Sequence, residues 1–135
     1  MHIVELEKYK VACHIDRRDL KLHGITVEDL INRTPLGHIF FKKAATLAKE
    51  STPYAWFGCG STMSIDIYED EVILIFSEQI EDYLYQLQQT SAALDAKQAQ
   101  GITDMIALIR RQPDEESARD IIRSFESQIR NVQNA

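Results

Sequence analysis

The sequence predicts an α+β fold: a small antiparallel sheet with helices on one face, followed by a helical C-terminal extension. Three observations lead to this prediction. Short segments with strand patterns occur in two pairs, capped helical segments separate the pairs, and from about residue 80 the apolar residues recur only at helical spacing. The 135 residues make an ordinary domain with an appendage, and we place the two parts at 1–80 and 81–135.

Four short segments have strand patterns, and we expect them to form two hairpins. Their residues are 2–6, 10–15, 62–68 and 72–76. Val11, Cys13 and Ile15 in the second segment are spaced by two, so they face the same side of the sheet. The fourth segment is a continuous apolar run, which is typical of a strand buried on both faces.

Capping residues predict three helices between the hairpins. Asp16, Thr26 and Thr34 are the expected N-caps, because their side-chain oxygens can accept a backbone hydrogen bond, and Gly24 is expected to end the first helix in a left-handed conformation. The third helix begins at Pro35. Its apolar residues at helical spacing predict the core face: Leu36, Ile39, Phe40, Ala44, Leu47 and Ala48.

Three amphipathic stripes predict helices in the C-terminal part. The stripes are Ile80, Tyr83, Leu84 and Leu87; Ile102, Met105, Ile106 and Ile109; and Ala118, Ile121, Ile122, Phe125, Ile129 and Val132. Gly101 and Pro113 mark the expected breaks. Isolated helices of this length are marginal in water, so the stripes must bury against the first part, against one another or against another chain.

Composition and charge exclude several classes of function. Fifteen basic and 21 acidic side chains leave a net charge of −6, which argues against nucleic acid or an anionic membrane as the main partner. No apolar run reaches the roughly 18 residues of a membrane-spanning helix, and the N-terminus has no visible secretory signal. We therefore expect a cytoplasmic protein in which Cys13 and Cys59 are free thiols.

The reactive residue types do not form a recognisable catalytic or metal-binding pattern. The four histidines lack ligand spacing, so no metal and no cofactor are expected. Residues 58–61, Gly-Cys-Gly-Ser, are the one sequence that looks like a catalytic loop, yet no histidine is nearby in the sequence. We predict no catalytic residue and no enzyme, and keep a thiol enzyme centred on Cys59 as an alternative.

An aromatic loop supplies the candidate binding residues. Tyr54, Trp56 and Phe57 stand beside proline and glycine, where they could be plugs of the core or a contact surface. The single Trp in this loop is the leading candidate for an exposed anchor. We therefore predict that Tyr54, Trp56 and Phe57 bind a partner.

Several segments of the first 80 residues carry a resemblance to a known family. They are the opening strands at 1–5 and 10–15, the sequence Asp-Arg-Arg-Asp-Leu-Lys-Leu-His-Gly-Ile at 16–25 with its continuation at 26–30, the pair Phe40-Phe41, and the hairpin at 63–76. With these segments, about 60% of the chain resembles the N-terminal domain of the MecA family, the adaptors also described as negative regulators of genetic competence. The segment 16–25 is similar to the acidic-leucine-glycine-isoleucine signature of that family.

The resemblance implies a bacterial adaptor protein that has no active site and takes part in regulated proteolysis. Family members present substrate proteins to the ClpC unfoldase, using the N-terminal domain for substrate capture and a separate C-terminal domain for contact with the unfoldase. The chain departs from the family after residue 80, where no second set of strands is predicted. The expected partner is thus a protein substrate or regulator, with a ClpC-type unfoldase as a further partner. The alternative is a homodimeric module built on the helical tail.

Overall fold

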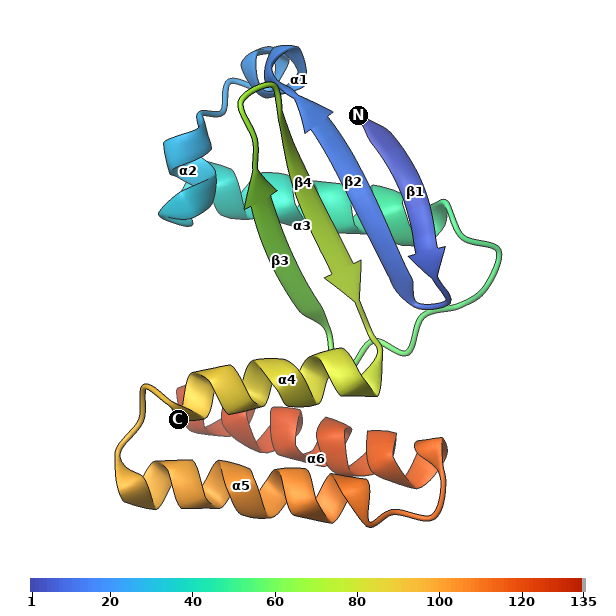
Figure 1. Ribbon diagram of the computed structural model, residues 1–135, viewed down its shortest axis with the longest axis vertical. Coiled ribbons are helices and arrows are strands. Elements are labelled where there is room, and N and C mark those ends of the chain that lie inside the picture. Colours follow the sequence, from blue (N-terminus) through green and yellow to red (C-terminus); the bar gives the residue numbers. More distant parts are fainter. Residues whose placement is uncertain (135) are drawn as a thin grey trace. The chain divides into compact units, whose positions relative to one another are not determined.

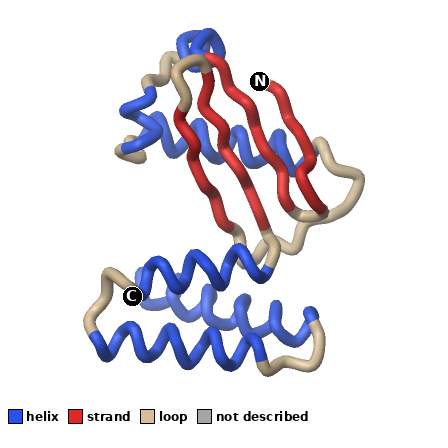
Figure 2. The backbone as a smooth tube through the Cα atoms, viewed as in Figure 1, coloured by secondary structure: helices blue, strands red, loops and turns tan. Residues whose placement is uncertain are grey.

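The structure, a computed structural model, describes residues 1–134, with side chains up to residue 129, and divides into two compact units. Unit 1 holds Met1–Trp56 and Met63–Ser77, and unit 2 holds Phe57–Thr62 together with the chain from Glu78 onward. The strands belong to the first unit and three long helices to the second (Figure 2). The second unit therefore combines the chain from Glu78 onward with a short loop from earlier in the sequence.

Unit 1 contains a four-stranded antiparallel sheet in the order β1-β2-β4-β3. The strands are β1 (His2–Glu7), β2 (Lys10–Asp16), β3 (Thr62–Ile67) and β4 (Glu71–Ser77). The two hairpins that we predicted are present, and they join because β2 and β4 pair antiparallel at the centre of the sheet. Cys13 lies opposite Ile3 on one side and Leu74 on the other.

Three helices separate the hairpins: α1 (Arg17–Leu22), α2 (Val27–Ile31) and α3 (Pro35–Glu50). Each begins at its predicted N-cap, since the side chains of Asp16, Thr26 and Thr34 accept hydrogen bonds from the first turn of their helices. Gly24 follows α1 at φ +66°, the left-handed conformation predicted for it. The longest of the three, α3, runs behind the sheet (Figure 1).

The core of unit 1 lies between α3 and one face of the sheet. Its central members are Val11, Cys13, Ile15, Val72, Leu74 and Phe76 from the strands and Phe40, Phe41, Ala44 and Ala48 from α3. The intervening residues of β4, Ile73 and Ile75, are only partly buried, so the prediction that this strand is buried on both faces was wrong. Burial raises the pKa of the Cys13 thiol to about 11.

The predicted core face of α3 was partly wrong. Leu36, Ile39 and Leu47 keep 57%, 63% and 39% of their surface exposed, while Phe41, which we had left out of the stripe, is buried. Because Phe40 and Phe41 both turn toward the sheet, the buried face is centred between them. The other large apolar side chains of α3 are left on a different side of the helix.

Unit 2 is built on α4 (Ile80–Ser91), α5 (Ala96–Arg110) and α6 (Glu115–Asn134). Part of each predicted stripe forms its core, with Tyr83 and Leu84 from α4, Ile106 and Ile109 from α5, and Ala118 and Ile122 from α6. Ile129, which we also placed in the third stripe, keeps 40% of its surface exposed. Val132, the last residue of the third stripe, lies outside the residues whose side chains are described. None of the described helices is apolar over a length sufficient to cross a membrane.

One predicted break in the C-terminal part was wrong. Gly101 lies inside α5, and the chain turns instead at 92–95, where Asp95 caps the new helix by accepting a hydrogen bond from the Gln98 N–H group. The environment of Gly101 is open, so the lack of a side chain costs helix propensity without preventing the helix. The second predicted break, at Pro113, does fall between α5 and α6.

Candidate functional site

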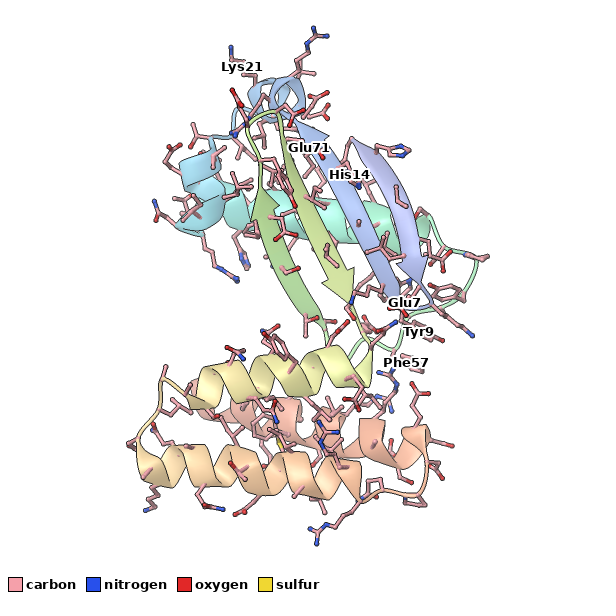
Figure 3. All side chains as sticks on the ribbon, in the orientation of Figure 1. Glu7, Tyr9, His14, Lys21, Phe57 and Glu71 are labelled. Carbon is pink, nitrogen blue, oxygen red and sulfur yellow. The ribbon has the colours of Figure 1, made fainter. Side chains whose placement is uncertain are left out.

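Two of the predicted binding residues, Tyr54 and Trp56, form an aromatic cluster with Tyr9 in unit 1. The ring centroids of Tyr9 lie 4.8 Å from Tyr54 and 5.7 Å from Trp56, both edge-on, and Tyr54 and Trp56 are stacked at 6.0 Å. Tyr9 closes the β1–β2 hairpin (Figure 3) at φ +66°, a strained conformation for a bulky residue. Ring packing in the cluster offsets this strain, so the cluster stabilises the end of the hairpin.

Hydrogen bonds engage the polar atoms of the cluster. The Tyr54 hydroxyl accepts from the Tyr9 N–H group at 2.8 Å and donates to a Glu5 carboxylate oxygen at 2.7 Å, while the Trp56 indole N–H donates to the Thr52 hydroxyl at 2.8 Å. Partial burial, together with the hydrogen bond and charge of Glu5, raises the pKa of Tyr54 above its usual value. Tyr54 and Trp56 are half-buried and fixed in place, which favours a supporting role for them over that of a free anchor.

Two ammonium groups lie over the faces of these rings. The Lys8 Nζ atom is 5.5 Å from the ring centre of Tyr9 and 5.6 Å from that of Tyr54, and the Lys49 Nζ atom is 5.4 Å from Trp56. Contacts of this kind stabilise by about 0.5–1 kcal/mol at exposed positions. The two lysines place positive charge beside Tyr54 and Trp56, the loop residues that pack against the first hairpin.

The third predicted binding residue, Phe57, belongs to unit 2. Its ring packs against the core of that unit, and the guanidinium carbon of Arg119 lies 3.5 Å from the ring centre. Arg119 is itself buried and donates to the Glu78 carbonyl oxygen at 2.8 Å and to a Glu115 carboxylate oxygen at 2.7 Å. The three predicted residues are therefore divided between the two units, with Tyr54 and Trp56 in unit 1 and Phe57 in unit 2.

The loop that follows is held by a buried carboxylate. Glu78 is fully buried, and its Oε1 accepts from the N–H groups of Phe57 at 2.7 Å and Gly58 at 3.0 Å, while its Oε2 accepts from the Ser61 hydroxyl. Cys59 is 4% exposed and packs in the core of unit 2, a unit whose sequence contains no histidine. Tight packing of the loop therefore explains why glycines and a small thiol side chain occur at these positions.

The histidines lie at scattered positions in unit 1. His14 on β2 faces Glu71 on β4, with 3.3 Å between Nδ1 and a carboxylate oxygen (Figure 3), and the ring of His2 lies 6.1 Å from that of His14. In the part of the chain that the structure describes, no three His, Cys, Asp or Glu side chains are grouped closely enough to hold a metal ion.

A surface that the sequence did not predict lies along α3. Four exposed residues follow one side of this helix, because they are spaced by three or four positions. We call them the α3 ridge: Leu36, Ile39, Lys43 and Leu47. The sequence did contain evidence of this surface, because α3 has more large apolar residues than one core face about 100° wide accommodates. We had assigned that excess to the core.

The basic character of α3 accompanies the ridge. Lys42, Lys43 and Lys49 give the helix three positive charges against the single negative charge of Glu50, although the whole chain is acidic. Lys43 lies within the ridge, so the exposed apolar side chains together with this charge make a surface suited to a partner with apolar and acidic groups.

Comparison with known protein families finds no match for this sequence, and comparison with curated proteins finds none either.

Proposed function

We propose that this protein is a non-enzymatic adaptor or regulatory protein whose unit 1 binds a segment of a partner protein. The α3 ridge is the observation that carries the proposal, since three large apolar side chains on one helix side remain between 39% and 63% exposed. Aligned apolar side chains of this kind are typical of surfaces that bind proteins. The sheet-facing side of α3 already supplies the core, so the fold of unit 1 does not account for the ridge.

The resemblance to the N-terminal domain of the MecA family supports the same proposal. It suggests a substrate protein as the partner, regulated proteolysis through a ClpC-type unfoldase as the process, and the bacterial cytoplasm as the place. Unit 2 contains three helices and no strand of its own beyond the first residue of β3 in its described part, which differs from the second domain of those adaptors. Substrate capture by unit 1 is therefore the central claim, and contact with the unfoldase is tested separately.

The test compares the full chain with two variants of α3. Ile39→Glu places a charge in the ridge, and His38→Glu places the same charge at an exposed neighbouring position outside it. Each protein is immobilised, and binding of a permanently unfolded model protein and of a ClpC-type unfoldase is measured. We expect Ile39→Glu to weaken capture of the unfolded protein by roughly tenfold and His38→Glu to leave it within about twofold.

Both substituted residues are exposed, so the variants should keep the stability of the original chain within about 0.5 kcal/mol. Urea unfolding checks this. Failure of the original chain to bind either protein would refute the adaptor function. Equal capture of the unfolded protein by the original chain and both variants would show that the α3 ridge does not bind it.

No specific observation favours the two alternatives. The amphipathic stripes that suggested a homodimer largely face one another within the core of unit 2. The Cys59 thiol that suggested an enzyme is enclosed in the same core.

A further inference from the structure

Unit 2 contains a pocket of about 450 Å³ whose walls come from three segments of the chain. Its lining residues are Gly58 from the loop, Tyr83 and Leu87 from α4, and Phe125, Glu126 and Ile129 from α6. The volume falls in the range of about 300–1,000 Å³ that is usual for ligand-binding pockets. Neither the aromatic cluster nor the α3 ridge takes part in it.

Glu126 supplies the charge of the pocket. One of its carboxylate oxygens accepts a hydrogen bond from the Gly60 N–H group at 2.7 Å, which holds the carboxylate in place. No lysine or arginine among the residues with described side chains forms an ion pair with it. The carboxylate can therefore accept further hydrogen bonds from a ligand.

Tyr83 supplies a second polar group. Its side chain is more than nine-tenths buried, yet it lines the pocket, and its hydroxyl makes no hydrogen bond to any of residues 1–129, whose side chains the structure describes. Burial and the nearby negative charge of Glu126 raise the pKa of Tyr83 to about 12, so the phenol stays protonated at neutral pH. A phenol oxygen and a carboxylate thus offer acceptors to the same space.

The remaining walls are apolar. Leu87, Phe125 and Ile129 line the pocket with aliphatic and aromatic surface. An anionic ligand would be repelled by Glu126, and a purely apolar ligand would offer no hydrogen bond to the second carboxylate oxygen of Glu126 or to the phenol. An alkyl chain that ends in a cation satisfies both kinds of wall, because its methylenes cover apolar surface while its charged end donates hydrogen bonds.

We propose that this pocket of unit 2 binds the lysine or arginine side chain of a partner peptide. The methylenes lie against Leu87, Phe125 and Ile129, and the ammonium or guanidinium group donates to Glu126 and Tyr83. The proposal goes beyond the adaptor function, which rests on α3 in unit 1, and either one can fail while the other holds.

The test uses the full chain and three small probes. The first is a blocked Ala-Lys-Ala peptide, the second is the same peptide with norleucine in place of lysine, and the third is n-butylammonium. Binding is followed by chemical-shift changes of the backbone amides of Gly58, Leu87, Phe125 and Ile129. We expect the lysine peptide and n-butylammonium, which carry the same alkylammonium group, to bind at least tenfold more tightly than the norleucine peptide.

Two variants locate the charge. Glu126→Gln keeps an oxygen that can accept from the Gly60 N–H group, and it should weaken binding of the lysine peptide by at least tenfold. Asp120→Asn removes a charge from the same helix at an exposed position that pairs with Arg123 outside the pocket, and it should leave binding unchanged. If Glu126→Gln does not fold, the comparison of lysine with norleucine still decides the matter.

Three results would overturn the proposal. Equal binding of the lysine and norleucine peptides would remove the role of the cation, and a failure of n-butylammonium to bind would show that the alkylammonium group is not what the pocket holds. Arg130 follows Glu126 by four residues in the sequence, and its side chain lies outside those described. Binding seen only in Arg130→Gln would mean that a cation of the chain itself takes this place.

Discussion

Glu78 is the first residue after β4, and its fully buried carboxylate accepts hydrogen bonds from two backbone N–H groups and a hydroxyl. The loop that it holds contains Gly58 at φ +74° and Gly60 at φ +66°, conformations that most side chains disfavour. Glycine adopts these conformations without strain, and the Glu78 carboxylate accepts from the N–H groups that the loop presents at Phe57 and Gly58. The carboxylate therefore determines the path of the chain where it enters unit 2.

Removing this anchor should be costly. We expect Glu78→Ala to lower the free energy of unfolding by about 3 kcal/mol, because buried N–H groups would lose a charged acceptor, and Glu78→Gln to cause roughly half of that loss. Glu81→Ala, at an exposed position, should change it by less than about 0.5 kcal/mol. Urea unfolding measures all three, and a similar effect of Glu78→Ala and Glu81→Ala would contradict the proposed anchor.

The Asp29 carboxyl group makes the stability of unit 1 decrease at acidic pH. Hydrogen bonds from the Thr26 N–H group and then from the Thr34 hydroxyl lower the pKa of its carboxyl group. Because the folded-state pKa is below the unfolded value of about 3.9, the stabilisation is fully present above that pH and is lost as the pH falls through the folded-state pKa.

The corresponding experiment compares the original chain with Asp29→Asn. The difference in their free energies of unfolding should be largest near pH 6 and should shrink below pH 4. Carboxyl NMR titration should place the pKa of Asp29 below its usual range. A value at or above 3.9 would show that the capping hydrogen bonds do not favour the ionised form.

At the scale of elements, two helical glycines should respond oppositely to the same substitution. A Cβ atom at Gly37 of α3 would overlap the backbone carbonyl oxygen of Asp29, whereas a Cβ atom at Gly101 of α5 would meet open space. We expect Gly37→Ala to lower the free energy of unfolding by about 2 kcal/mol and Gly101→Ala to raise it by about 0.5–1 kcal/mol. Thermal unfolding measures both, and stabilisation by both would mean that α2 and α3 can separate freely.

These elements also show why some boundaries were predictable and others were not. Asp16, Thr26 and Thr34 cap helices through hydrogen bonds to residues three positions on, so their effect is visible in a short stretch of sequence. The turn at 92–95 is followed by a cap of the same kind, since the Asp95 side chain accepts from the Gln98 N–H group, but we placed the break at Gly101 instead. A glycine alone does not end a helix when nothing competes for the backbone.

At the scale of the whole molecule, the chain passes between its two units three times. It enters unit 2 at Phe57, returns to unit 1 at Met63 and enters unit 2 again at Glu78. Cys59 is thus covered by residues of α4, α5 and α6, although it precedes two strands of unit 1. The predicted division at residue 80 would cut this loop off from its core.

The reactivity of the two cysteines tests whether the loop with Cys59 is covered by the helices of unit 2. In the full chain both are buried, so both should react slowly with a thiol reagent at neutral pH. In a fragment of residues 1–80, Cys59 should react rapidly, whereas Cys13 should stay protected by the core of unit 1. Labelling followed by mass spectrometry distinguishes the two sites. Rapid reaction of both would show that unit 1 does not fold without the helices.

The surroundings of the candidate binding residues were harder to predict than the elements that carry them. The three loop aromatics are close in sequence, but Phe57 packs with Arg119, 62 positions later. Phe57 therefore belongs to unit 2, whereas Tyr54 and Trp56 belong to unit 1. The α3 ridge was hidden for the opposite reason, because Leu36 and Ile39 look like core residues until the two phenylalanines are placed. Contacts between distant residues set both outcomes.

Local sequence patterns were enough to predict the two hairpins, the three capped helices of unit 1 and the helical character of the tail. These features depend on interactions over a few residues, such as a cap hydrogen bond or an alternating pattern. Only the tertiary structure decided which side of α3 is buried, that Phe57–Thr62 joins unit 2, and that Glu126 and Tyr83 line one pocket. Those outcomes depend on the packing of segments far apart in the chain, where the most favourable burial selects among several faces that the local pattern allows.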